Sequence, residues 1–174
     1  RCLANIYGAQ SPDKAESFIQ SLSASQRRSI DVIERGMTND RLAQQAEELE
    51  NKGQWAQAVE VQRKRLALSP GDVWITYRLA SDLRQAGRPG EADSQMSQLV
   101  VQKPGDPEQV FAYGLYLSGN NQEMAALNHL NGLPKAKWNS NIQELADRLQ
   151  ANQLLAKASA LRDGGDEDQA IAFL

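Results

Sequence analysis

The chain has 174 residues, of which 41% are hydrophobic and 6% aromatic, and its net charge is −3. The negative charge argues against nucleic acid binding, which needs a clustered basic surface. No apolar run approaches the roughly 18–20 residues of a membrane-spanning helix, so we expect no membrane insertion by this chain. The one cysteine, Cys2, excludes an internal disulfide.

Residues 1–38 do not follow the pattern of the rest of the chain. The first seven residues read as the second half of a helix, and Ser11 followed by Pro12 is a favourable helix start. A second helix is predicted over about 25–37, with Ile30, Ile33 and Met37 facing inward. We interpret 1–38 as the end of a preceding repeat plus helices outside the repeat pattern.

Residues 39–138 contain three copies of a unit about 34 residues long. The matching positions carry the same or similarly small residues: Gly53, Gly87 and Asn121; Ala46, Ala80 and Gly114; Ala58, Ala92 and Ala126. This repeat length, with small and turn-forming residues at fixed positions, is typical of tetratricopeptide (TPR) repeats, in which pairs of antiparallel helices stack side by side. The predicted fold is therefore all-α, a TPR-type solenoid forming a right-handed superhelix.

The repeated spacing also predicts how the helices end and approach one another. Small residues allow two helices to pack closely, and Gly53 and Gly87 suit helix ends that need a left-handed residue. Pro70 and Pro104 would end the second helix of each pair, because proline cannot continue a helix.

After residue 138 the 34-residue spacing of the repeats is interrupted. The next copy is expected over 151–174, where it would be truncated, and Ala151 lies 44 residues after Pro107 instead of 34. The additional stretch, 139–150, begins with a capping-box pattern at Ser140 and Gln143 and continues with a helical stripe. It is predicted to be an extra helix, or part of one long helix with a shifted stripe, and to act as a hinge in the array.

The first helix of each TPR pair lines a concave groove, and positions spaced 3, 4 and 3 apart face it. This rule selects acidic residues beside aromatic ones on one continuous surface. The candidate binding residues are Asp40, Glu47, Glu50, Trp74, Tyr77, Arg84, Glu108 and Phe111. Such a surface suits a glucan or a peptide, and the simpler alternative is that Trp74 and Tyr77 only complete the packing between repeats.

Nothing in the residue pattern indicates an enzyme. His129 is the only histidine, and no phosphate-binding glycine loop or metal motif is present, so no catalytic residue, metal or cofactor is predicted. TPR domains that bind chaperone carboxyl termini use Lys and Asn where this chain has Ala43 and Glu47. An acidic first copy would repel a carboxylate, which argues against a chaperone adaptor.

Several segments resemble the periplasmic TPR region of the BcsC family of bacterial cellulose synthase proteins. They are Asn5-Ile6-Tyr7, Ser11-Pro12-Asp13-Lys14-Ala15-Glu16, Ser23-Ala24-Ser25-Gln26-Arg27-Arg28-Ser29-Ile30, Val73-Trp74-Ile75-Thr76-Tyr77-Arg78-Leu79, Tyr113-Gly114-Leu115-Tyr116-Leu117-Ser118-Gly119 and Trp138-Asn139-Ser140-Asn141-Ile142-Gln143-Glu144-Leu145. The resemblance implies a segment of a large outer-membrane protein, located in the periplasm, in which a TPR array precedes a β-barrel that exports cellulose.

On this basis the chain is expected to be a scaffold between the cellulose synthase complex and the export pore. Its partners would be other protein components of that machinery, and the groove could also guide the cellulose chain. A third alternative is a spacer, whose function lies in its length and curvature. A generic peptide-binding adaptor also remains open.

Overall fold

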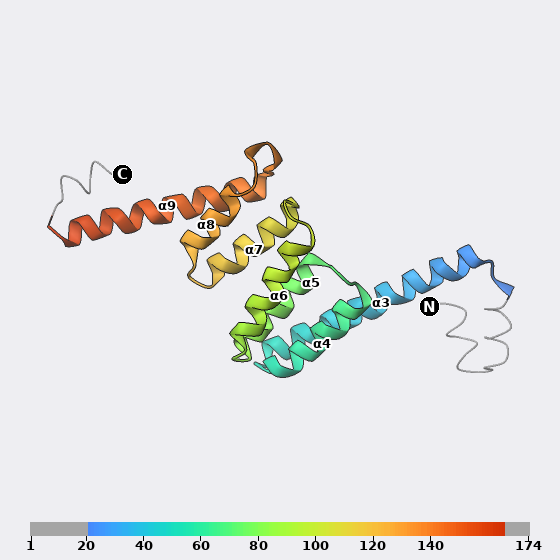
Figure 1. Cartoon of the computed structure of the whole chain (residues 1–174). Coiled ribbons are helices and arrows are strands. Elements are labelled where there is room, and N and C mark those ends of the chain that lie inside the picture. The colour runs from blue at the N-terminus through green and yellow to red at the C-terminus, as the bar shows by residue number, and fades with distance from the viewer. Residues whose placement is uncertain (1–20, 166–174) are drawn as a thin grey trace.

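The computed structural model describes residues 21–165, and all regular structure in that range is helical (Figure 1). Successive helices pair across short turns, and the pairs stack into an elongated array with α3 and α9 at opposite ends. The predicted all-α repeat solenoid is therefore confirmed. The helices are α3 (Ala24–Asn51), α4 (Trp55–Leu68), α5 (Val73–Gln85), α6 (Pro89–Gln102), α7 (Pro107–Gly119), α8 (Glu123–Asn131), the 3₁₀ helix η1 (Lys135–Lys137) and α9 (Ser140–Asp163).

The turn between the two helices of each pair has the same backbone geometry in all three copies. Gly53 and Gly87 have φ angles of 67° and 75°, and Asn121 has 59°. This left-handed conformation is easy for glycine, and asparagine tolerates it better than most other residues. Helices α4 and α6 end just before Pro70 and Pro104, as the sequence predicts.

The small residues of the repeat lie where the paired helices approach most closely. Ala58, Ala80, Ala92 and Ala126 are fully buried, and Ala46 is nearly so. In the third copy a Cβ atom on Gly114 would lie only 2.8 Å from Cδ2 of Leu130, so this pair is too close even for alanine without movement.

Two helices begin with an aspartate cap at equivalent positions of successive repeats. The side chain of Asp72 accepts hydrogen bonds from the first-turn amides of α5, and that of Asp106 does the same for α7. Asn139 caps α9 by accepting from the Ile142 amide, so the capping box predicted at Ser140 is wrong. The cap lies one residue earlier because an extended Asn139 places its own side chain over the first turn.

The predicted break between residues 38 and 39 is not a helix boundary, because α3 runs without interruption from Ala24 to Asn51. Its capping box is formed by Ser23 and Gln26. Only Gly36 interrupts the helix-forming residues, and one exposed glycine costs about 1 kcal/mol, which is too little to end a helix. The helix predicted from Ser11 begins outside the described residues.

The N-terminal half of α3 contributes little to the core. Val32, Ile33 and Met37 are 68%, 59% and 57% exposed, so the inward orientation predicted for Ile33 and Met37 is wrong. A helix face is buried only where another element covers it, and α4 covers the C-terminal half of α3, where Ala46 is buried.

At the other end, residues 139–150 are part of one long helix, α9, which is one of the two predicted alternatives. The stripe of Ile142, Leu145, Ala146 and Leu149 is buried against α7 and α8. No boundary occurs at Ala151, because the stretch from Lys135 to Arg162 contains neither glycine nor proline. Residues 166–174 of the expected further repeat lie outside the described range.

Two hydrophobic clusters hold the array together and meet at α7. The first joins α4, α5, α6 and α7, and the second joins α7, α8 and α9. Tyr113 packs against both clusters, so consecutive repeats share one continuous core. None of the described helices is both long and apolar enough to cross a membrane.

Candidate functional site

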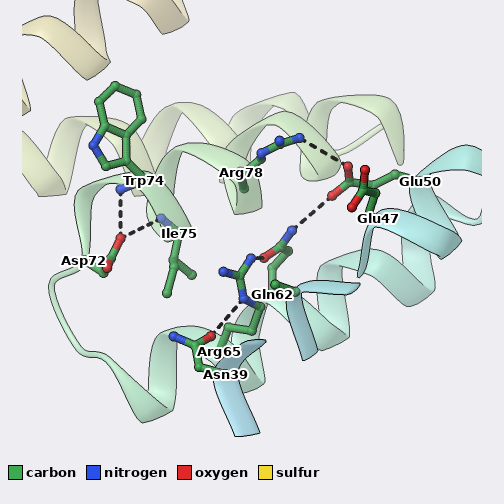
Figure 2. Close-up of a pocket in the computed structure, with 10 residues that line it drawn as sticks. Asn39, Glu47, Glu50, Gln62, Arg65, Asp72, Trp74, Ile75 and Arg78 are labelled. Carbon is green, nitrogen blue, oxygen red and sulfur yellow. Dashed lines mark hydrogen bonds and ion pairs between the residues drawn. The ribbon is translucent and has the colours of Figure 1, made fainter. Parts of the chain in front are cut away.

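The first helices of the repeats border a hollow of about 380 Å³ between α3, α4 and α5 (Figure 2). Its lining is mostly polar and combines carboxylates, guanidinium groups and amides with one aromatic residue. The lining residues are Asn39, Ala43, Glu47, Glu50, Gln62, Arg65, Asp72, Trp74, Ile75 and Arg78.

A network of hydrogen bonds fixes the polar wall of this hollow. Glu50 accepts from Gln62 Nε2 at 3.1 Å and from Arg78 at 3.3 Å, and Figure 2 shows it between these two side chains. Arg65 donates to Gln62 Oε1 at 2.8 Å and to Asn39 Oδ1 at 2.9 Å. The hollow therefore presents donors and acceptors that are already held in place by their neighbours.

Trp74 forms a ridge at the edge of the hollow. Its indole N–H donates to Glu108 Oε1 at 2.8 Å, and its ring meets Tyr77 and Phe111 edge to face, each at 6.0 Å between centroids. The Asp72 cap holds its backbone amide. Despite these contacts Trp74 is 41% exposed, so the ring is oriented firmly without being covered.

A second, smaller hollow of about 250 Å³ lies between α7 and α9. Phe111 connects it to the ridge, because this residue both lines the hollow and contacts Trp74. The remaining lining residues are Leu115, Asn141, Glu144, Leu145 and Arg148. The contribution of α9 was not predicted, because the extra helix has no counterpart in the repeat.

The structure brings most of the predicted groove residues together. Trp74, Tyr77, Glu108 and Phe111 form the ridge, and Glu47 and Glu50 line the first hollow. Asp40 is exposed on α3 and lines neither hollow. That these residues bind a partner stays a prediction.

Arg84 does not join this surface and has a structural partner instead. Its guanidinium donates to the Tyr116 hydroxyl at 2.8 Å and to Asp93 at 2.9 Å, and Tyr116 donates to Asp93 at 2.6 Å. The hydrogen bonds from Tyr116 and Arg84 lower the pKa of Asp93, while burial raises the pKa of Tyr116 to about 12. This triad ties α5, α6 and α7 together. Arg84 lines neither hollow because its long side chain reaches the following repeat, and a binding role for it stays a prediction.

Sequence reasoning missed four side chains of the hydrogen-bond network at the first hollow: Asn39, Gln62, Arg65 and Arg78. Gln62 and Arg65 lie on α4, a second helix, whereas the groove rule considers first helices only. Arg65 is half-buried and bonded within the network. A hydrogen-bond network between residues far apart in the chain has no recognisable sequence pattern.

His129 is half-buried and packs edge to face on Tyr113, at 4.8 Å between ring centroids. Burial lowers its pKa. This contact joins α8 to α7. Within residues 21–165, no three His, Cys, Asp or Glu side chains come close enough to hold a metal ion.

Comparison with known proteins identifies relatives of this chain. No family profile matches the chain. Over 170 residues, however, 98% of its length, it is 66% identical to a protein of Salmonella typhimurium and to one of Escherichia coli. Both are cellulose synthase operon protein C. The chain spans only 14–15% of the length of these relatives.

A more distant relative is cellulose synthase operon protein C of Komagataeibacter xylinus. It is 33% identical over 94 residues, which are 54% of this chain and 7% of that protein. Among solved structures, "MamA RS-1 ArsTM double mutant" has a TM-score of 0.43 and 18% identity, covering 98% of this chain and 86% of the other. The sequence matches confirm the resemblance to the BcsC family.

Proposed function

We propose that this chain is a scaffold segment of a cellulose-export protein, and that it binds protein components of the synthase machinery along its concave surface. The observation that supports this role is Trp74. A large aromatic ring is held rigidly by Glu108, Tyr77 and Phe111, stays 41% exposed and stands between two hollows.

Such an arrangement has the features of a binding site for a protein. Aromatic residues are enriched among the side chains that contribute most to protein interfaces, and they contribute most when they are held in place before binding. The hollows on either side would accept the partner's side chains. The first offers Glu47 and Arg78 at its surface, and the second offers Glu144 and Arg148.

The relatives' name, cellulose synthase operon protein C, supports a place in the cellulose machinery. We propose that the segment lies in the periplasm, bridges the synthase complex and the outer-membrane pore, and contacts other proteins of that machinery. We infer that the segment does no chemistry itself. Glu50, the most buried acidic group in the first hollow, is bonded to Gln62 and Arg78 and not placed beside a nucleophile.

The scaffold role is tested by measuring binding of the chain to purified periplasmic parts of the synthase complex. Tyr77→Ala and Phe111→Ala should weaken binding at least tenfold, because each removes one contact that orients Trp74. Val101→Ser is a matched control, because Val101 is 75% exposed on α6, a second helix. Equal loss in the control, or no loss in the groove variants, would contradict the proposal.

The same surface supports a second function, guidance of the cellulose chain. Sugar rings present C–H faces that stack on aromatic rings, and hydroxyl edges that pair with both carboxylates and guanidinium groups. A rigid indole beside a hollow with mixed donors and acceptors offers both kinds of contact.

Titration with cellohexaose distinguishes this function from the first. Tryptophan fluorescence and heat should report saturable binding that is lost in Trp74→Ala, with a chitin oligomer as the control for selectivity. No binding at millimolar sugar would eliminate the glucan surface and leave a protein scaffold or a spacer.

A further inference from the structure

Asp82, on α5, is a carboxyl group in the interior of the array. The residue is 3% exposed, and within the described part of the chain its Oδ2 atom has no hydrogen-bond partner. Burying an ionised carboxylate without full pairing is costly, so such a group tends to bind a proton instead. No feature of the groove proposed above uses this residue.

The groups facing Asp82 come from three helices. Its pKa is influenced by Glu50 on α3, Gln62 on α4 and Arg78 on α5 itself. Gln62 is 1% exposed and donates to Glu50, and Arg78 also donates to Glu50. The one nearby cation is therefore shared with a second carboxylate, and it does not pair with Asp82 through a hydrogen bond.

The charged groups of the other helices packed on α5 are engaged elsewhere. On α6, Glu91 bonds to Arg88 and Arg63, and Asp93 bonds to Arg84 and Tyr116. On α7, Glu108 accepts from Trp74. On α4, Arg65 is bonded to Gln62 and Asn39. None of them offers a direct counter-charge to Asp82.

We propose that the buried Asp82 carboxyl group holds a proton, and that this proton fastens α5 to α3 beneath the first hollow. With the proton present, Asp82 donates and Glu50 accepts. Without it, Asp82 becomes a second negative charge beside Glu50, at a position where the Asp82 side chain is shielded from water. Because Glu50 also positions Gln62 and Arg78, loss of the proton loosens the wall of the hollow.

The electrostatic environment places this change near neutral pH. Burial first, and then the charge of Glu50, raise the pKa of Asp82 from 3.8 to about 7. Between these two values the folded chain holds a proton that the unfolded chain has lost. Its contribution to stability is therefore fully present below about pH 4, falls as the pH rises, and is lost once the pH passes about 7.

The first test compares the thermal unfolding of the chain with that of Asp82→Asn between pH 5 and pH 8. Asparagine resembles the protonated acid but cannot ionise, so the Tm of the variant should rise relative to the natural chain as the pH increases. His129, whose pKa is lowered by burial, titrates in both proteins and cancels in the difference. A difference in Tm that does not change with pH would overturn the proposal.

Asp93→Asn is a control at a carboxyl group whose pKa is lowered instead of raised. The pKa of Asp93 is lowered, chiefly by its hydrogen bond from Tyr116, so it is ionised throughout this pH range. Its replacement should lower Tm by the same amount at every pH from 5 to 8. A pH-dependent change equal to that of Asp82→Asn would show that the effect does not arise at Asp82.

A direct titration is independent of how well the variants fold. The carboxyl ¹³C resonance of Asp82 in the natural chain should show a midpoint near 7. Glu50→Gln should move that midpoint down, whereas Glu47→Gln, on the exposed face of the same helix, should leave it in place. A midpoint near 4, or one that Glu50→Gln does not move, would refute the proton on Asp82.

Discussion

Individual residues of the array differ sharply in what they tolerate, and two glycines of α7 show this. A Cβ at Gly114 would lie 2.8 Å from Leu130 Cδ2 and 3.4 Å from Leu145 Cδ2, whereas one at Gly119 would meet nothing within 4 Å. Leu130 is fully buried and cannot simply move aside.

Gly114→Ala should therefore destabilise the chain by roughly 1–2 kcal/mol through overpacking, even though alanine favours the helix. Gly119→Ala, the matched control, should be neutral or slightly stabilising. Urea unfolding followed by circular dichroism measures both. Equal stabilities for the two variants would show that α7 and α8 are packed less closely than the structure indicates.

The Arg84–Asp93–Tyr116 triad is also a residue-scale feature. Tyr116→Phe removes the hydroxyl that bonds both Arg84 and Asp93, and should cost about 1–2 kcal/mol, because hydrogen bonds to charged groups are stronger than neutral ones. Tyr113→Phe, in the same helix, is the control, since its hydroxyl has no hydrogen bond in the described part of the chain. A cost equal to that of the control would mean that the triad adds nothing to stability.

At the scale of elements, the aspartate caps set where the first helices of the second and third repeats begin. Asp106 accepts from the amides of Glu108 and Gln109 at 2.9 and 3.3 Å. Asp106→Ala should cost about 1 kcal/mol, and Asp106→Asn much less, because asparagine caps nearly as well. Denaturant unfolding of both variants checks this, and an equal loss in the two would show that the charge matters more than the cap.

The repeat register explains which parts of the site were predictable. Trp74 and Glu108 occupy equivalent positions of successive repeats, as do Tyr77 and Phe111, so stacking the repeats brings all four together. The fold class, the turns and the close helix contacts follow from the same register. The hollow between α7 and α9 could not be predicted, because α9 lies outside the repeat and its position depends on tertiary packing.

Helix boundaries were predicted less well than the repeats, for a related reason. Between Thr38 and Asp40 the sequence offers good capping residues, yet α3 continues through them, because the one nearby helix breaker, Gly36, costs too little to end the helix. Capping residues permit a helix start without requiring one. Local signals therefore locate a boundary only where a breaker reinforces them, as at Gly53 and Pro70.

At the scale of the whole molecule, α9 forms one end of the described array (Figure 1). Its first half is buried against α7 and α8, while Leu154 and Leu155 in its second half are 44% and 55% exposed. The hinge predicted near 139–150 should appear in solution scattering as data that need more than one conformer. A single rigid arrangement that fits all the scattering data would remove the hinge.

The central claim is that the concave surface of this segment is used in cellulose export. The decisive measurement is the amount of cellulose exported by cells whose full-length protein carries Trp74→Ala and Phe111→Ala, at unchanged protein level. The control carries Val101→Ser and Met124→Ser, at exposed positions of the second helices. We predict a severe loss with the groove pair and normal export with the control. Normal export with both pairs would contradict a binding role and leave a spacer.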